Sequence, residues 1–223
     1  MLLLHAIGPA EAPASGLPTA RVRPDWPVQA LGACGLVAWA SVVDEPQPLG
    51  RDDLLAHHRL AEQALAAGLC LPVRFPTWLA DEDAVRELLK RRREALVTAL
   101  ERVRGRVELA VTVTWTTPEA AGQPVVPSTP GRRYLHERRQ HYAQADERRA
   151  EAQRLASLLA ADERVVEATH TLCPSPEIGL SSALLVANTD ALAVAERLRE
   201  LPQSVRILVN GPWPPYSFVS LEG

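Results

Sequence analysis

The stretch R-V-E-L-A-V-T-V-T-W, residues 106–115, alternates apolar and polar side chains along its length. Successive side chains of a strand point to opposite faces, so this alternation predicts a β-strand with one buried face. The preceding residues, 81–104, have a different period, because their apolar side chains recur every three or four positions, as in an amphipathic helix. A helix that leads into such a strand indicates a domain that combines both elements.

The residues before this helix extend the mixed pattern. We predict strands at Leu2–Ile7, at 69–75, and as a pair around a glycine turn within 28–43. Residues 51–67 have helical spacing, and we expect His57 to face solvent on this helix. The expected packed stripe of this helix consists of Leu54, Leu55, His58, Ala61 and Leu65. The expected buried stripe of the 81–104 helix consists of Val85, Leu88, Leu89, Leu96, Leu100 and Val103.

The second half of the chain repeats the mixture of helix and strand. Residues 116–130 contain four prolines and a glycine, which predicts a linker. From 131 to 162 there is no proline and no further glycine, so we expect one long helix. Strands are predicted at 164–172, 183–187 and 205–209, with a helix from Thr189 or Asp190 through Leu201.

The expected fold class is therefore α+β, with two domains. The first is an α+β domain of residues 1–115, the linker is 116–130, and the second domain is 131–223. The order helix, strand, strand, helix, strand in the second domain is similar to a split β-α-β arrangement.

Composition narrows the function. The chain has 223 residues, 47% of them apolar, and a net charge of −3, which gives no general attraction to nucleic acid or to anionic lipid. No stretch approaches the roughly 18 apolar residues of a membrane span, and the first residues lack the basic region of a signal peptide. The three cysteines, Cys34, Cys70 and Cys173, lie far apart, and we expect them to be buried in a cytoplasmic protein.

Candidate chemical motifs are weak. His58 and Glu62 lie four apart on one helix face, but no third metal ligand is nearby in sequence. His170 and Cys173 are three apart on a strand and so face opposite sides. No phosphate-binding glycine loop occurs, and the basic run 90–93 is expected to be a solvated helix face. We therefore expect no catalytic residue, no cofactor and no metal, and partners other than nucleic acid or a membrane.

The closing segment, N-G-P-W-P-P-Y-S-F-V at 210–219, is rich in proline and aromatic residues. Proline lacks a backbone N–H, so this segment must be a sheet edge, a turn or an extended plug. Two interpretations stay open. Either the rings fold back to close the second domain, or they bind a partner, in which case the partner-binding residues are Trp213, Pro214, Pro215, Tyr216 and Phe218.

Six segments, taken in order, resemble the gas vesicle protein F/L family. They are D-L-L-A-H-H-R-L-A-E-Q-A-L-A-A-G at 53–68, L-P-V-R-F at 71–75, D-E-D-A-V-R-E-L-L at 81–89, G-R-V-E-L-A-V-T-V-T-W at 105–115, P-G-R-R-Y-L at 130–135 and G-P-W-P-P-Y-S-F at 211–218. The resemblance implies a non-enzymatic accessory protein of gas vesicles with a ferredoxin-like second domain. It further implies that the partners are the hydrophobic shell subunit and other accessory proteins, and that the protein is associated with the vesicle as a minor component.

A second class stays open beside this resemblance. A cytoplasmic α+β protein can build a small-ligand or catalytic site from residues that are distant in sequence. A ligand that raises the melting temperature would favour this class, because only binding to the native state stabilises it.

Overall fold

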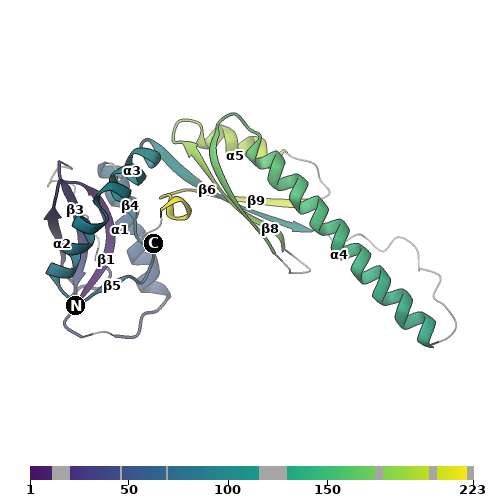
Figure 1. Ribbon diagram of the computed structural model, residues 1–223, viewed down its shortest axis with the longest axis horizontal. Coiled ribbons are helices and arrows are strands. Elements are labelled where there is room, and N and C mark those ends of the chain that lie inside the picture. Colours follow the sequence, from purple (N-terminus) through teal and green to yellow (C-terminus); the bar gives the residue numbers. More distant parts are fainter. Residues whose placement is uncertain are drawn as a thin grey trace. The chain divides into compact units, whose positions relative to one another are not determined.

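The computed structural model describes the backbone of residues 1–11, 21–45, 47–68, 70–115, 130–173, 178–200 and 205–219 (Figure 1). The α+β class predicted from the sequence is confirmed, because helices pack with two separate sheets. Among these residues, no helix has the length and apolar character needed to cross a membrane.

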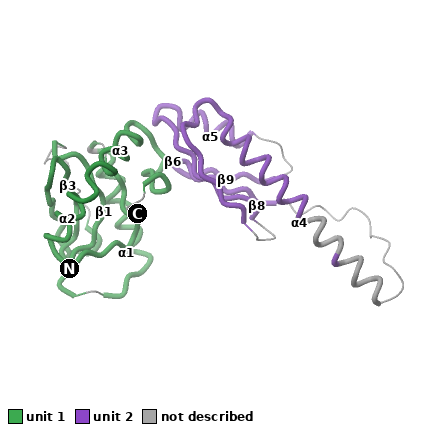
Figure 2. The backbone as a smooth tube through the Cα atoms, in the orientation of Figure 1, with its two compact units in different colours: residues 1–108, 212–223 green, residues 109–211 purple. Residues whose placement is uncertain are grey.

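The chain divides into two compact units (Figure 2). Unit 1 comprises Met1–Glu108 with Pro212–Gly223, and unit 2 comprises Leu109–Gly211. Residues 212–219 of the closing segment thus belong to unit 1, whereas the sequence analysis placed the segment in the second domain. The reason is that Phe218 and Val219 are buried, Val219 within the core of unit 1. Most of the predicted linker, 116–130, lies outside the described residues.

Unit 1 contains a five-stranded sheet in the order β2-β3-β1-β4, with β5 also paired to β1. Its strands are β1 (Leu2–Pro9), β2 (Val28–Ala33), β3 (Leu36–Val42), β4 (Leu71–Pro72) and β5 (Trp78–Leu79). The predicted glycine turn joins β2 to β3 through Cys34 and Gly35, both at positive φ, as a two-residue hairpin loop requires. The strand predicted over 69–75 is shorter than expected, since only β4 pairs there.

Three helices cover this sheet: α1 (Arg51–Ala67), α2 (Glu82–Arg91) and α3 (Arg93–Val103). The single helix predicted over 81–104 is in fact two, because the backbone leaves helical geometry at Arg92 (φ −103, ψ 11). The break lets both halves pack into one cluster. Five residues of the expected stripe are buried there, and Leu88 is partly buried against them.

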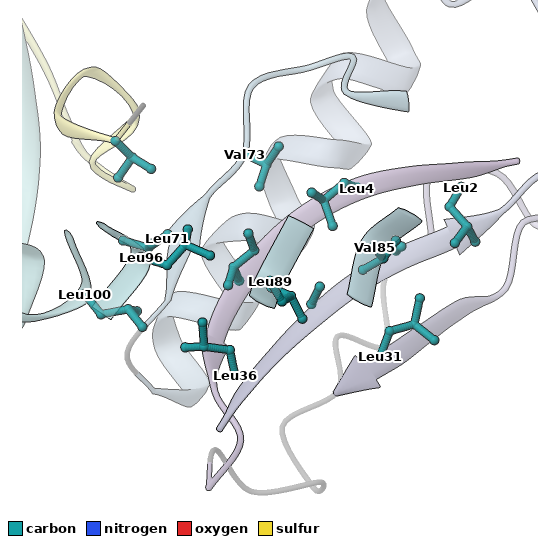
Figure 3. Packing of buried hydrophobic residues seen from close by; sticks show 14 of the residues in the cluster. Leu2, Leu4, Leu31, Leu36, Leu71, Val73, Val85, Leu89, Leu96 and Leu100 are labelled. Carbon is teal, nitrogen blue, oxygen red and sulfur yellow. The ribbon is translucent and has the colours of Figure 1, made fainter. Parts of the chain in front are cut away.

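The core of unit 1 lies on both faces of the sheet. Leu2, Leu4 and Ile7 of β1 pack with residues of α2 and α3, and Figure 3 shows this cluster from close by. On the opposite face, Leu3 packs with Leu60 of α1, and Ala6 with Ala64 of the same helix. Because β1 is covered on both faces, it is buried along almost its whole length.

Unit 2 is built on a four-stranded sheet in the order β7-β8-β6-β9. Its elements are β6 (Arg106–Trp115), α4 (Pro130–Ala160), β7 (Val165–Leu172), β8 (Ile178–Ala187), α5 (Ala191–Arg199) and β9 (Val205–Trp213), of which the start of β6 and the end of β9 belong to unit 1. Helix α4 packs on β7 and β8. The predicted long helix and all three predicted strands are present, with β8 and β9 longer than expected.

The cysteines differ in exposure. Cys70 is buried as expected, but Cys34 is exposed and Cys173 is half-buried. The expectation was wrong for Cys34 because this residue occupies the exposed loop of the β2-β3 hairpin.

Candidate functional site

A pocket of about 510 Å³ opens on the surface of unit 1, beside helix α1. Its lining residues are Leu54, Leu55, His57, His58, Arg74, Phe75, Glu108, Trp213 and Tyr216. These nine residues come from four parts of the chain that are distant in sequence. All nine lie within four of the six segments on which the family resemblance rests.

The wall formed by α1 is apolar and open. Leu54 and Leu55 are 47% and 40% exposed, and the rings of Phe75, Trp213 and Tyr216 are half-buried beside them. Single exposed leucines are ordinary, but two adjacent leucines that border aromatic rings in a concave surface indicate a binding site. This pocket is therefore the candidate functional site.

His58 holds the closing segment against α1. Its ring lies edge-on to Trp213, with centroids 4.9 Å apart, and 5.9 Å from the Tyr216 ring. Burial raises the pKa of Tyr216, so the phenol stays protonated, and its O–H can donate to His58 Nδ1 at 3.4 Å. The other ring nitrogen, Nε2, then carries its hydrogen toward Glu62 Oε1 at 3.6 Å.

Glu108 anchors the same segment from β6. Its carboxylate accepts from the Ser217 backbone N–H at 2.8 Å and from the Ser217 hydroxyl at 2.9 Å. Burial raises the pKa of Glu108, and the two hydrogen bonds from Ser217 oppose that shift. The short 3-10 helix at Tyr216–Phe218 is thereby fixed, and Phe218 is 3% exposed.

Behind the pocket lies a buried chain of hydrogen bonds. His57 Nε2 lies 2.8 Å from the Val73 carbonyl oxygen, which can only accept, so Nε2 carries the hydrogen. His57 Nδ1 is then an acceptor for His5 Nδ1–H at 2.9 Å, and His5 Nε2 accepts from the Ser41 hydroxyl at 2.8 Å. A bulge in β1 between Leu4 and Ala6 leaves His5 without a partner on β3, which lets it reach α1.

This chain has the connectivity of a serine nucleophile with two histidines, but its environment argues against that role. Ser41 is fully buried and does not line the pocket, so no substrate reaches its hydroxyl. Burial lowers the pKa of His5 to about 3, with a smaller effect of the neighbouring His57, and burial also lowers the pKa of His57. Two neutral, fully hydrogen-bonded histidines act here as structural groups.

The expectation that His57 faces solvent is thus wrong, whereas His58 packs as expected, against the ring of Trp213. His57 is 1% exposed, whereas His58 is half-buried at the pocket. The inward face of α1 consists of Asp53, His57, Leu60, Ala61 and Ala64.

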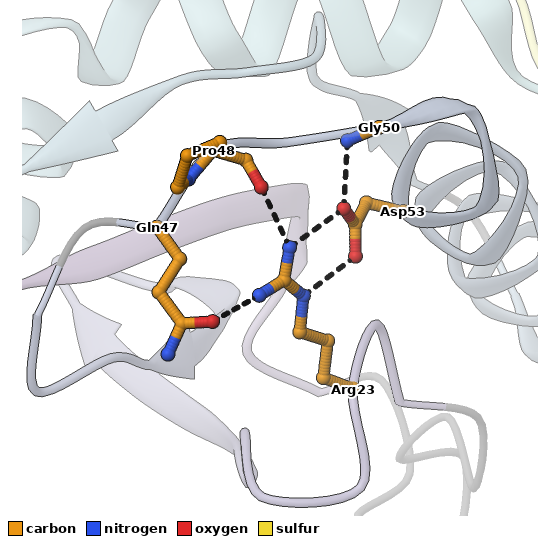
Figure 4. Close-up of polar contacts among 5 residues, drawn as sticks. All are labelled: Arg23, Gln47, Pro48, Gly50 and Asp53. Carbon is orange, nitrogen blue, oxygen red and sulfur yellow. Dashed lines mark hydrogen bonds and ion pairs between the residues drawn. The ribbon is translucent and has the colours of Figure 1, made fainter.

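The reason that Asp53 and His57 face inward lies at the start of α1 (Figure 4). Arg23 donates from Nε and from a terminal nitrogen to the two carboxylate oxygens of Asp53, both at 2.8 Å. The same carboxylate accepts from the Gly50 N–H at 2.8 Å, and the guanidinium also bonds Gln47 and the Pro48 carbonyl. The Arg23 hydrogen bond is the main reason that the pKa of Asp53 is lowered. With Asp53 held inward, Leu54 and Leu55 must face outward.

The five residues predicted to bind a partner have different environments. Trp213 and Tyr216 line the pocket, whereas Pro214, Pro215 and Phe218 are buried beneath the segment. Sequence reasoning missed Arg74 and Glu108 as lining residues and placed Leu54 and Leu55 in the core. The sequence did contain one signal of the true orientation of α1. Asp53 and His57 are polar residues that lie four apart and so share one helix face.

The other candidate motifs do not form a second site. His170 bonds Ser182 of the neighbouring strand β8 at 2.9 Å, and no interaction joins it to Cys173 among the described residues. In the described part of the chain, no group of three or more histidine, cysteine, aspartate or glutamate side chains could hold a metal ion.

Comparisons with known proteins agree on one family. The family model described as gas vesicle synthesis protein GvpL/GvpF matches residues 3–220. Gas vesicle protein F of Streptomyces sp. (strain CB03234) is 32% identical over 213 residues, covering 88% of this chain and 89% of that protein. Gas vesicle protein L of the same strain is 32% identical over 191 residues, covering 76% of this chain and 70% of that protein.

Solved structures support the fold. The crystal structure of gas vesicle protein GvpF from Anabaena sp. PCC7120 matches with a TM-score of 0.77 at 20% identity, covering 100% of this chain and 97% of that chain. The crystal structure of GvpF from Microcystis aeruginosa matches with a TM-score of 0.74 at 17% identity, covering 97% of this chain and 98% of that chain.

Proposed function

Because the chain belongs to the gas vesicle GvpL/GvpF family, we propose that it is an accessory protein that supports gas vesicle assembly by binding the hydrophobic shell subunit. The observation that carries this proposal is the open apolar pocket of unit 1. A shell subunit with a strongly apolar face would aggregate before assembly unless another protein covered that face. A concave surface with exposed leucines and aromatic rings suits this task.

The contact residues in this proposal are Leu54, Leu55, Trp213 and Tyr216. Trp213 and Tyr216 offer large rings on a segment that prolines and Glu108 already hold in place, so little conformational entropy is lost on binding. Pro214, Pro215 and Phe218 act indirectly, because they are buried and position these two rings.

Several finer expectations belong to the same proposal. The protein acts in the cytoplasm, associates with the vesicle as a minor component, and also binds other gas vesicle accessory proteins. Its role is not enzymatic, and its partners include neither nucleic acid nor a membrane. Unit 2 contains β6 from Leu109 onward, and its elements follow the order β-α-β-β-α-β. In this proposal it is a ferredoxin-like domain.

Co-expression with the shell subunit tests the proposal. The fraction of subunit in the soluble extract, and the amount that co-purifies with this chain, are measured against cells that lack the chain. We expect more soluble subunit and a stable complex. A folded protein that neither solubilises nor retains the subunit would contradict the proposal.

A second candidate function is the binding of a small apolar ligand in the same pocket. Its volume of about 510 Å³ lies within the range of ligand pockets, roughly 300–1,000 Å³. A thermal-shift screen of metabolites separates the two functions, since a stabilising metabolite that competes with the subunit would favour this alternative.

A further inference from the structure

The charged side chains around the pocket differ in whether they have a hydrogen-bond or ion-pair partner within this protein. Glu108 is 7% exposed and accepts two hydrogen bonds from Ser217, so its negative charge is directed at the closing segment. The Glu62 carboxylate at the rim lies 3.6 Å from His58. Each of these two carboxylates thus already has a partner within this protein.

Arg74 differs from these groups. It is exposed, it lines the pocket, and within the described part of the chain its side chain takes part in no hydrogen bond or ion pair. Its backbone is held in place, because its carbonyl accepts from the Thr77 hydroxyl at 2.7 Å, and Val73 before it bonds the β1 backbone. The pocket therefore presents an apolar wall beside an unneutralised guanidinium whose backbone is held in place.

We propose that the pocket binds a partner segment that places an acidic side chain beside an aliphatic one, with the carboxylate on Arg74 and the aliphatic group against Leu54, Leu55 and Trp213. This inference rests on the proposed function and names the chemistry of the segment that is bound. A guanidinium pairs well with a carboxylate, especially where neighbouring rings exclude water. The aliphatic contact supplies affinity, and the ion pair supplies orientation and selects against basic segments.

Two model helices test this chemistry directly. Both are alanine-rich peptides of about 18 residues, long enough to be helical in water, with the same leucine face. One carries glutamate beside the leucines and the other carries lysine. Calorimetry with the full-length protein should show the glutamate helix binding about five- to tenfold more tightly.

Arg74→Glu should reverse this order of affinity, and Arg74→Lys should keep it with a smaller difference. The matched control is Arg91→Glu, which makes the same charge change at an exposed site of α2 outside the pocket and should leave the order unchanged. The preference should decrease at high salt, because an exposed ion pair is screened. Melting temperatures verify that each variant is folded.

Equal affinities for the two helices, or a preference for lysine in the unaltered protein, would overturn the inference. It would also be overturned if a second copy of this chain occupied the pocket, seen as a dimer that Arg74→Glu dissociates. Co-purification of the shell subunit separates the two proposals. If the subunit is retained while neither helix binds, the inference fails and the proposed function stands. If the glutamate preference and its reversal are seen without subunit retention, the proposed function fails and the pocket chemistry stands.

Discussion

In its first two turns, helix α1 has two faces whose chemistry is the reverse of an ordinary surface helix. Its inward face contains Asp53 and His57, both of which are buried with complete sets of hydrogen-bond partners. Its outward face presents Leu54 and Leu55, which are exposed at the pocket. Polar groups tolerate burial only when they are paired, and the exposed part of a leucine side chain gains no stability from burial. The difference indicates that the inward face maintains the fold and the outward face is available for binding.

The largest effect should come from removing the buried histidine. His57→Leu keeps much of the side-chain volume but leaves the His5 N–H and the Val73 carbonyl without partners, so we expect the free energy of unfolding to fall by about 2–4 kcal/mol. His58→Leu is the matched control on the other face and should cost less than about 1 kcal/mol. Denaturant unfolding measures both, and equal losses of stability would contradict the difference between the two faces of α1.

Acidification should act on the same buried pair. The pKa of His5 is lowered to about 3 and that of His57 is also lowered, so each contributes stability that is complete above the unfolded pKa of about 6.5 and is lost as the pH falls below it. Between pH 6.5 and 5 we expect the contribution of His5 to fall by up to about 2 kcal/mol, and that of His57 to change in the same direction.

Glu108 acts in the opposite direction, because burial raises its pKa. Urea unfolding of the Glu108→Gln variant as a function of pH therefore gives the cleaner histidine effect. A flat profile from pH 7 to 5 would contradict the neutral, buried assignment.

The next prediction concerns the closing segment, which forms another wall of the pocket and is anchored by Glu108. Ser217→Ala removes the hydroxyl that donates to Glu108 but keeps the backbone donor, so we expect a loss of about 1–2 kcal/mol in the free energy of unfolding. Ser157→Ala, at an exposed serine of α4, should change it by less than about 0.5 kcal/mol. A Ser217 effect no larger than the control would mean that Glu108 does not fix the segment.

The smallest effect should come from the rim of the outward face. His58 and Glu62 form a partly exposed pair at 3.6 Å on one turn of α1, and Glu62→Gln should lower stability by no more than about 0.5 kcal/mol. Thermal unfolding at low and high salt measures this. A loss above 1 kcal/mol would show that the outward face also maintains the fold.

The elements of the fold were predictable from sequence because their signals are local. The alternation in 106–115 predicted β6, and helical spacing predicted α1 and the long helix α4. The rotation of α1 was not predictable, since Arg23 and His5 are distant in sequence from Asp53 and His57. The place of the closing segment likewise depends on Glu108 and Ser217, which are 109 residues apart.

The central claim is that the outward face of α1 binds the shell subunit. The most direct test compares Leu55→Asp with Leu192→Asp in co-purification of the subunit, with unfolding measured for both variants. Leu192 is the control site, because it is also an exposed leucine of a helix, 69% exposed on α5 in unit 2. We expect both variants to fold normally and only Leu55→Asp to lose the subunit. Retention of the subunit by a folded Leu55→Asp protein would contradict the claim.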